Sequence, residues 1–212
     1  PFTITSYYIM NFLGHALLSN KDEGLLLGNM MGDFIKGRLA LAAYPKQVQA
    51  GILMHRAIDQ FTDQHPALIR AQLIFKQRYQ RYSGAIIDTI MDHFLANDAK
   101  FFPNEETLQS FSSDTYASLA KQAEHFAPQF DKAFESMQQH NWLFHYKTTM
   151  GIKKSLEGLS RRATYLGDTQ EAYDLFIAHY FYLNNCYYEF IEDMCIFAHQ
   201  YRSNLLHETT SN

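Results

Sequence analysis

The segment from residue 45 to residue 66, PKQVQAGILMHRAIDQFTDQHP, constrains the fold most strongly, because it predicts one helix with polar groups on its buried face. Pro45 suits a first helical turn, and Pro66 marks where that helix must end or restart. The residues that recur at helical spacing on one face are Val48, Ile52, His55, Asp59 and Thr62. The two apolar members should point into a core and carry the imidazole and the carboxylate with them.

His55 and Asp59 lie one turn apart, so their Cβ atoms should be only about 5–6 Å from each other. Both side chains could therefore bind one metal ion, or they could pair with each other as a structural contact. A charge buried without a partner would be neutralised by desolvation. This face of the helix is therefore expected to hold a cation.

Composition favours a helical, intracellular protein. The 212 residues include only 10 Gly and 5 Pro, which disfavours a strand-and-turn architecture. Eighteen basic and 22 acidic residues give a net charge of −4, which does not suggest a nucleic-acid binder. No apolar run approaches the roughly 20 residues that span a bilayer, and the N-terminus lacks a signal-peptide pattern. Cys186 and Cys195 point in different directions on one helix, so we expect free thiols, a cytoplasmic location and no membrane partner.

Helical periodicity extends over most of the chain. Further helices are expected near residues 23–37, 66–81, 83–101, 104–140, 141–166 and 169–206. Gly28 and Gly32, one turn apart, predict a smooth patch where another backbone approaches closely. We predict a single all-α domain, a helical bundle of about seven to nine helices over residues 10–206. Residues 1–9 are expected to form an N-terminal extension, and residues 207–212 a C-terminal tail.

Four polar groups interrupt the apolar helix faces: His15, Asp33, His55 with Asp59, and Asp88 with Asp92 and His93. Imidazoles and carboxylates without thiolates suit a catalytic site for Mn, Fe, Mg or Zn, and helical bundles can build such sites. Each group also has a structural explanation. His15 could be a satisfied core histidine, Asp33 could brace a neighbouring helix, and Asp88 could be a solvated acid in a first helical turn.

Several segments, in the same order along the chain, resemble the acyl carrier protein phosphodiesterase family, whose members are also called acyl carrier protein hydrolases. They are NFLGH at 11–15, GNMMGDFIKG at 28–37, GILMHRAIDQFTDQHP at 51–66, DTIMDHFLAND at 88–98 and WLFHYKTTMGIKKSLEGLSRR at 142–162. The resemblance implies an all-helical, HD-domain-like fold, because the family is regarded as a divergent branch of the metal-dependent HD-domain phosphohydrolases. Those proteins carry a His-Asp doublet, whereas this chain has the reverse order, Asp92-His93.

The resemblance implies hydrolysis of the phosphodiester that joins 4′-phosphopantetheine to a serine of holo acyl carrier protein. It also implies a divalent metal, Mn²⁺ or else Mg²⁺. The candidate metal ligands are Asp33, His55, Asp59, Asp92 and His93. The candidate catalytic residues are Asp33 and His15, which could orient or deprotonate water, and Arg56, which with Lys36 could offset charge on the phosphoryl oxygens.

An acidic carrier protein would need a basic docking surface. Two clusters are candidates: Arg70, Lys76, Arg78 and Arg81, and then Lys153, Lys154, Arg161 and Arg162. These residues could equally be solvated helix faces. Two other functions stay open, namely an HD-type phosphohydrolase of a small nucleotide and a non-enzymatic helical binding module.

Overall fold

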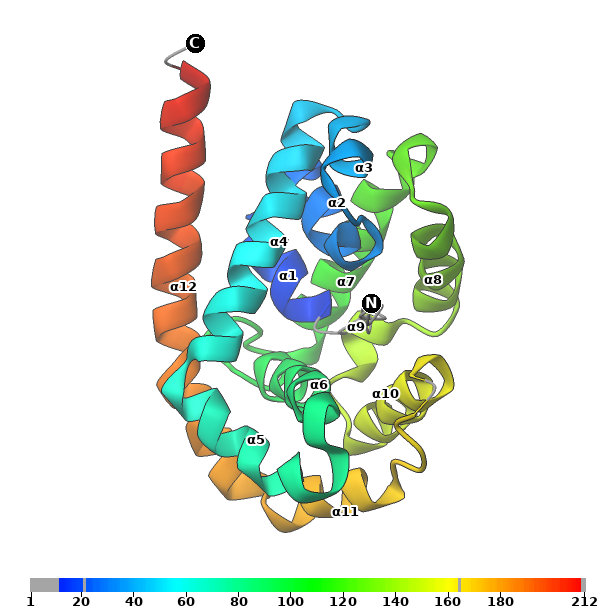
Figure 1. Ribbon diagram of the computed structural model, residues 1–212, viewed down its shortest axis with the longest axis vertical. Helices are drawn as coiled ribbons and strands as arrows, with labels where there is room; N and C mark the ends of the chain where they lie inside the picture. Colours follow the sequence, from blue (N-terminus) through cyan, green and yellow to red (C-terminus); the bar gives the residue numbers. More distant parts are fainter. Residues whose placement is uncertain (1–11, 21, 164, 211–212) are drawn as a thin grey trace.

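The computed structural model describes residues 12–20, 22–163 and 165–210, without the side chains of Arg162 and of residues 206–210. These residues form helices joined by short loops and contain no strand (Figure 1). The α-helices are α1 Phe12–Leu18, α2 Glu23–Met31, α3 Arg38–Ala42, α4 Lys46–Gln64, α5 Pro66–Tyr79, α6 Ser83–Ala96, α7 Glu105–Ala120, α8 Pro128–Gln139, α9 Trp142–His145, α10 Thr149–Arg162, α11 Gln170–Ala178 and α12 Tyr180–Thr210. Three 3₁₀ turns, η1 Gly32–Phe34, η2 Gln80–Tyr82 and η3 Ala123–His125, complete the described secondary structure.

The all-α prediction is confirmed, but the predicted number of helices is too low. The helix over 23–37 ends at Met31 and continues only as the 3₁₀ turn η1, and α3 and α9 have five and four residues. Such short helices contain too few turns to leave a periodic pattern. The long pattern from residue 169 is two helices, α11 and α12, which meet at His179. Backbone bonds of 3.0 Å from His179 N to Leu175 O and from Leu183 N to His179 O bridge this junction. The apolar spacing therefore shows no interruption.

The ends of the predicted domain fall partly outside the described residues. The proposed extension, residues 1–9, lies wholly outside them. At the other end α12 continues to Thr210, beyond the predicted boundary at residue 206. In Figure 1 the last turns of α12 reach past the neighbouring α4. Within the described part of the chain, no helix has both the length and the hydropathy to cross a membrane.

Helices α2 and α4 pack with their backbones almost in contact, as the glycine spacing predicts. A Cβ atom on Gly28 would lie 2.1 Å from the carbonyl oxygen of Val48. A Cβ atom on Gly51 would lie 2.4 Å from the carbonyl oxygen of Leu25. Real Cβ atoms do not approach that closely, so only glycine fits at these positions. The small residues thus bring the η1 turn, which follows α2, against the middle of α4.

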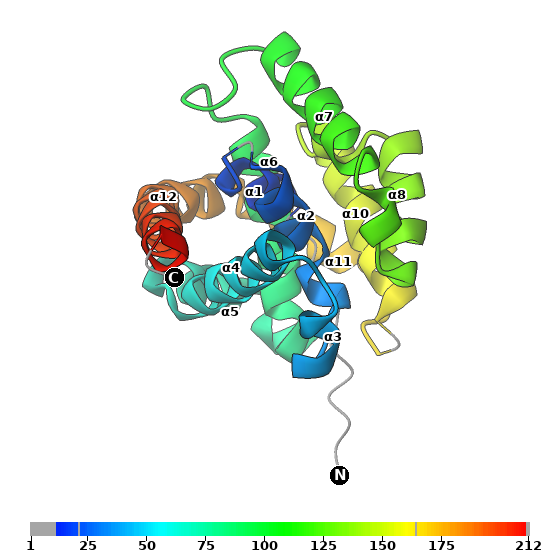
Figure 2. The same ribbon diagram turned by 90° about the horizontal axis from the view of Figure 1, so that it is seen from above.

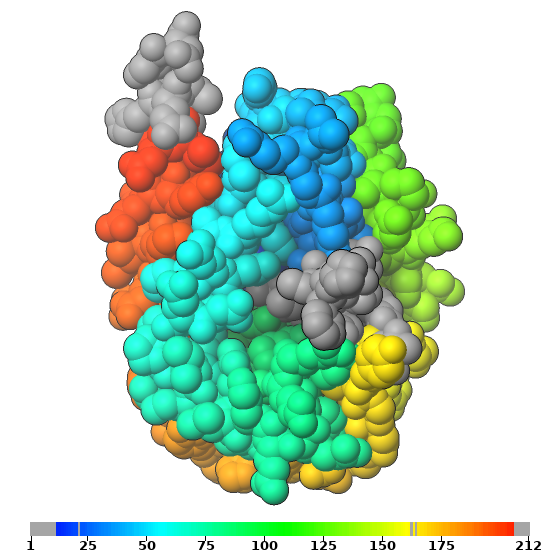
Figure 3. Space-filling model, viewed as in Figure 1, coloured from blue at the N-terminus to red at the C-terminus, as the bar shows by residue number. Residues whose placement is uncertain are grey.

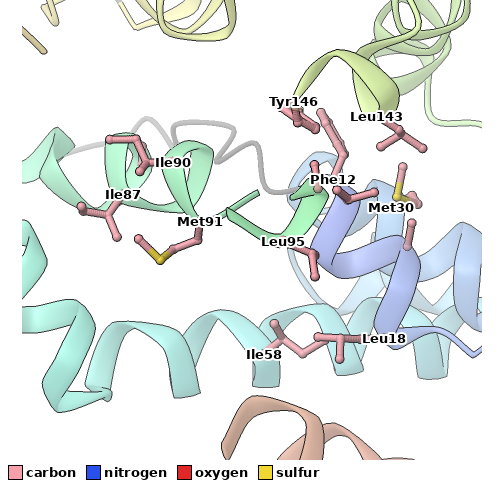
Figure 4. Close-up of a cluster of buried hydrophobic side chains, with 14 of the residues drawn as sticks. Phe12, Leu18, Met30, Ile58, Ile87, Ile90, Met91, Leu95, Leu143 and Tyr146 are labelled. Carbon is pink, nitrogen blue, oxygen red and sulfur yellow. The ribbon is translucent and has the colours of Figure 1, made fainter. Parts of the chain in front are cut away.

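Helix α6 is the centre of the core. It contacts α1, α5, α10 and α12, and nearly all of its residues are buried. Figure 4 shows its side chains Ile87, Ile90, Met91 and Leu95 in the buried cluster, which also includes Ile58 of α4. Seen from above in Figure 2, α4, α5 and α12 lie on one side of the molecule, and α7, α8 and α10 lie on the other. A helix buried on every side carries all its polar residues inward, including Asp88, Asp92 and His93.

Candidate metal centre

Four of the predicted side chains meet where α1, η1 and α4 come together. His15 Nε2 lies 3.2 Å from Asp59 Oδ1, and His55 Nε2 lies 3.2 Å from Asp59 Oδ2. Asp33 Oδ1 approaches His55 Nε2 at 3.4 Å. The two imidazole rings stack with centroids 4.1 Å apart. One ligand atom each from His15, His55 and Asp59 lies within 4.8 Å of the others, close enough to share one ion.

Asn29 of α2 fixes the orientation of both imidazoles. Its side-chain oxygen lies 2.7 Å from His15 Nδ1, and its backbone carbonyl oxygen lies 2.8 Å from His55 Nδ1. Its amide nitrogen donates to the His15 carbonyl at 2.8 Å and to Ser19 Oγ at 3.1 Å, which leaves the side-chain oxygen to accept. Because a carbonyl oxygen can only accept, each Nδ1 carries a proton, and a ring that holds no second proton presents a lone pair at Nε2. This arrangement is typical of histidine metal ligands.

Three of the buried polar atoms in this cluster lack a hydrogen-bond partner. Both Nε2 atoms and Asp33 Oδ2 are buried without a hydrogen bond, although carboxylate oxygens lie only 3.2–3.4 Å from the imidazole nitrogens. Those oxygens are near enough but not aligned for a hydrogen bond. Imidazole nitrogens and carboxylate oxygens bind metals such as zinc at about 2.0–2.2 Å, so ligand atoms about 3–4.4 Å apart can surround one ion. The residues therefore fit a divalent metal.

The electrostatics of the cluster also favour a cation. Burial lowers the pKa of His15, and the neighbouring His55 lowers it further. Burial alone would lower the pKa of His55, but Asp59 and Asp33 outweigh it and raise that pKa to about 10. The pKa of Asp59 falls well below its usual range despite burial, because His55 and His15 stabilise the carboxylate. In the metal-free protein, a proton on His55 thus supplies the positive charge that the two carboxylates require.

Local sequence explains how these side chains reach one point. His55 and Asp59 are one turn apart on the buried side of α4, as predicted. Gly32 lies directly over the His55 ring, and a Cβ atom there would be 2.4 Å from His55 Cγ. Asp33 follows Gly32 in η1, so the close approach of α2 to α4 also determines where the Asp33 carboxylate lies.

Asp92 and His93 bond to other partners, so the ligand set that we propose from the structure leaves them out. Asp92 accepts hydrogen bonds from Leu13 N at 3.0 Å and Gly14 N at 2.9 Å, and it therefore caps the start of α1. Burial raises the pKa of Asp92 to about 8 in spite of these two bonds. His93 Nδ1 donates to the carbonyl of Tyr146 at 2.8 Å, and its Nε2 lies 2.9 Å from the Tyr180 hydroxyl. With both nitrogens bonded, His93 has no lone pair for a metal.

Asp88 is buried rather than solvated, so its interpretation as an exposed acid in a first turn is wrong. Burial raises the pKa of Asp88 well above its usual value, and the nearby Asp59 raises it further. With His15 it borders a narrow, mainly apolar cavity of about 40 Å³ between α1, α4, α6 and α12. The position of Asp88 near the start of α6, where acids are commonly exposed, had suggested the solvated alternative.

Arg56 lies beside the cluster but points outward. Its side chain is exposed, and Nη2 donates to the carbonyl of Ile35 at 2.8 Å, two residues after Asp33. Lys36 is exposed in the same segment. Both lie near the candidate ligands Asp33 and His55 along the chain.

The two predicted docking clusters are partly neutralised or stacked. Arg70 pairs with Glu189, and Arg78 Nε lies 3.0 Å from Glu171 Oε2. The Arg81 guanidinium lies over the ring of Tyr82, and the Lys153 ammonium lies 5.5 Å from the centre of the Tyr173 ring. Exposed side chains at the other described positions are those of Lys76, Lys154 and Arg161, whereas the Arg162 side chain lies outside the described residues.

Asn29 was not among the residues predicted from the sequence, although its segment contained a signal. In GNMMGD, Asn29 is a polar residue among glycines and methionines on a helix predicted to pack closely. A buried amide needs several partners, so its presence there indicates neighbouring polar groups that it must satisfy.

Comparison with known proteins links this chain to one family. The sequence profile of the acyl carrier protein phosphodiesterase family matches residues 10–194. A protein of that name from Photorhabdus laumondii is 31% identical over 182 residues, covering 85% of this chain and 91% of the relative. Two others bearing the name, from Salmonella paratyphi A and Yersinia pestis, are 30% and 29% identical over 185 residues, each alignment covering 87% of this chain and 95% of the relative. No solved structure matches the chain significantly. The chain thus belongs to the acyl carrier protein phosphodiesterase family.

Proposed function

We propose that this protein is a metal-dependent phosphodiesterase that releases 4′-phosphopantetheine from the serine of holo acyl carrier protein. Family membership supports the reaction and the substrate. The observation that carries the metal requirement concerns the Nε2 atoms of His15 and His55. Both are buried without a hydrogen bond, although oxygens of Asp59 and Asp33 lie 3.2–3.4 Å away. A helical binding module has no need of such an arrangement.

The metal ligands in this proposal are His15, His55 and Asp59, with Asp33 as a fourth ligand or as a base. Two imidazoles favour Mn²⁺ over Mg²⁺, which prefers oxygen ligands. A bound divalent cation would supply positive charge that polarises the phosphoryl group and acidifies a water molecule. His15 thereby moves from the catalytic role expected from sequence to that of a ligand.

The protein's own groups hold and move protons around this centre. Asn29 keeps both Nδ1 atoms protonated, so the Nε2 lone pairs remain directed at the site. Asp33 Oδ2 is buried without a hydrogen bond and can accept a proton from a nucleophilic water. Arg56, anchored on Ile35, can place guanidinium charge near the phosphoryl oxygens.

Kinship with the HD-domain phosphohydrolases remains a proposal. Its support is the distribution of the ligands. The HD-domain proteins carry one histidine apart from the His-Asp doublet, and His15 is likewise separate from His55 and Asp59, which share α4. In this chain the imidazole and the carboxylate are one helical turn apart instead of adjacent in sequence. The same ligand set would serve hydrolysis of a small nucleotide, so the substrate must be tested directly.

The test is incubation of the purified protein with holo acyl carrier protein and Mn²⁺, followed by mass spectrometry of both products. We expect apo carrier protein and free 4′-phosphopantetheine in equal amounts, and no reaction with EDTA. The matched control is His93→Ala, which removes a buried histidine outside the cluster. If nucleotides are hydrolysed while holo carrier protein stays intact, the substrate assignment is wrong.

A further inference from the structure

The stretch of chain between the two acids of the cluster contains basic residues and no acidic ones. From residue 34 to residue 58, between Asp33 and Asp59, the chain contains no acidic residue. The basic residues in this interval are Lys36, Arg38, Lys46 and Arg56. These basic residues lie on the segment that joins η1 to the middle of α4. They are therefore close in sequence to the candidate ligands Asp33 and His55.

Helix α3, in the middle of this stretch, is almost wholly exposed. It contains no buried residue, and Leu39 is 91% exposed, more than any other large hydrophobic side chain described. The helix is nevertheless anchored. Leu41 and Tyr44 pack against the core, and Gln49 Nε2 donates to the Tyr44 carbonyl at 2.7 Å. A single exposed leucine is common on protein surfaces, so Leu39 bears on docking only together with the charges around it.

Positive charge on α3 and at the start of α4 is available to a partner. Within the described part of the chain, neither Arg38 nor Lys46 forms an ion pair or a side-chain hydrogen bond. By contrast, Arg70 and Arg78 of the 70–81 cluster already pair with Glu189 and Glu171. An acidic partner would have to compete with those glutamates on α5, whereas it could pair directly with the cations around Leu39.

The two carboxylates are the more exposed part of the cluster. The side chains of Asp33 and Asp59 are 16% and 22% exposed, whereas those of His15 and His55 are 1% and 5% exposed. Solvent therefore reaches the site from the carboxylate side, and one of the carboxylates, Asp33, lies on η1, which precedes α3 in the chain. On the face seen in Figure 3, the chain around α3 (blue) lies beside the first turns of α4 (cyan).

The proposed reaction requires the carrier protein to dock around the candidate ligands. The phosphodiester links the prosthetic group directly to a serine of the carrier protein, so that serine must reach the metal ligands. A partner surface that surrounds the serine must then contact residues bordering the site. Lys46 shares α4 with His55 and Asp59, and Lys36 and Arg38 follow Asp33 closely in the chain, whereas the 70–81 cluster lies on α5 and η2.

We propose that Lys36, Arg38, Leu39 and Lys46, the α3 surface, dock an acidic protein face that carries an apolar side chain. Resting on the proposed function, this partner is the acyl carrier protein, and the α3 surface replaces the 70–81 cluster as the docking site. The cations steer and orient the partner, and Leu39 is buried in the contact.

The test measures binding of a carrier protein labelled on its phosphopantetheine thiol, by fluorescence anisotropy, to the metal-free full-length protein, in which turnover is stopped. Arg38→Glu with Lys46→Glu, and separately Leu39→Ser, should each raise the Kd by on the order of tenfold. The matched controls are Arg78→Glu and Leu73→Ser, an exposed arginine and an exposed leucine outside the α3 surface, which should change the Kd less than about twofold.

Wild-type Kd values in all α3 variants, or equal weakening by the controls, would overturn the proposal, as would absence of binding to the wild type. Circular dichroism separates lost docking from lost folding, and Arg38→Gln, which only neutralises one charge, should give a smaller increase in Kd. Failure of the proposed function looks different, since the wild type would then bind the labelled carrier protein without releasing 4′-phosphopantetheine when Mn²⁺ is restored.

Discussion

A Cβ atom on Gly32 would lie 2.4 Å from Cγ of His55, so the imidazole occupies the space that any other residue at position 32 would fill. The absence of one methyl group sets the distance between η1 and α4. It also sets the position of Asp33, the next residue, relative to the His55 ring. The geometry of the proposed metal centre therefore depends on a residue that contributes no ligand.

Gly32→Ala should displace the His55 ring and strongly reduce bound metal, while most of the helical structure remains. Metal content of the purified variant measures this directly. The control is Gly84→Ala in α6, where an added Cβ would meet its nearest neighbour, Gln72 Nε2, at an ordinary 3.7 Å. Equal metal content in the two variants would show that the packing of Gly32 on His55 does not control the site.

Asn29→Ala should weaken metal binding by about 10–100-fold, because it removes the hydrogen bond that fixes the ring of His15. The backbone carbonyl that orients His55 remains, so binding should be reduced rather than abolished. Competition with a metal-sensitive dye measures the affinity. Asn97→Ala, which removes an amide bonded to the carbonyls of His93 and Lys147, serves as control and should bind metal normally.

Asp92→Ala should destabilise the protein without removing the metal. The change leaves the buried N–H of Leu13 and the N–H of Gly14 without their acceptor, at a cost of roughly 1–3 kcal/mol. Urea unfolding gives the stability, and elemental analysis gives the metal content. Loss of metal from folded Asp92→Ala protein would restore Asp92 to the ligand set.

Metal affinity should rise with pH across the neutral range. The carboxylates raise the pKa of His55 to about 10, so in the metal-free protein a proton must leave before the nitrogen can bind an ion. Affinity should therefore increase by roughly tenfold per pH unit up to that pKa. An affinity that is constant between pH 6 and 8.5 would mean that no such proton is displaced.

Because of the same shift in the pKa of His55, the stability of the metal-free protein should fall as the pH rises. The pKa of His55 is higher in the folded state than its ordinary 6.5, so the protonated imidazole contributes stability that is fully present below pH 6.5. This contribution is lost as the pH rises toward 10. In thermal melts, the stabilisation produced by added metal should therefore grow with pH, because the ion replaces a proton that is held less tightly.

Sequence periodicity predicted the part of the site that lies on one helix. The spacing of Val48, Ile52, His55 and Asp59 indicated both the buried face of α4 and the polar pair on it. The glycine spacing in α2 predicted the close approach that the structure shows at Gly28. Both are local properties, which the order of residues along one helix determines.

The contacts between helices could not be predicted in the same way. Periodicity shows that a side chain is buried but does not show which neighbour it faces. Helix α6 is buried on all sides, so Asp92 turns toward α1, and His93 turns toward Tyr146 and Tyr180. His15, by contrast, joins the cluster because α1 packs beside α2, where Asn29 receives its ring.

We propose that His15, His55, Asp59 and Asp33 bind one divalent ion. Titration of the metal-free protein with Mn²⁺ tests this proposal. Electron paramagnetic resonance counts the bound ions and detects hyperfine coupling to imidazole nitrogen. We expect one tight site per chain with two coupled imidazoles in the wild type, the same spectrum in His93→Ala, and loss of that site in His55→Ala. A His55→Ala protein that binds Mn²⁺ with wild-type stoichiometry and affinity would contradict the account.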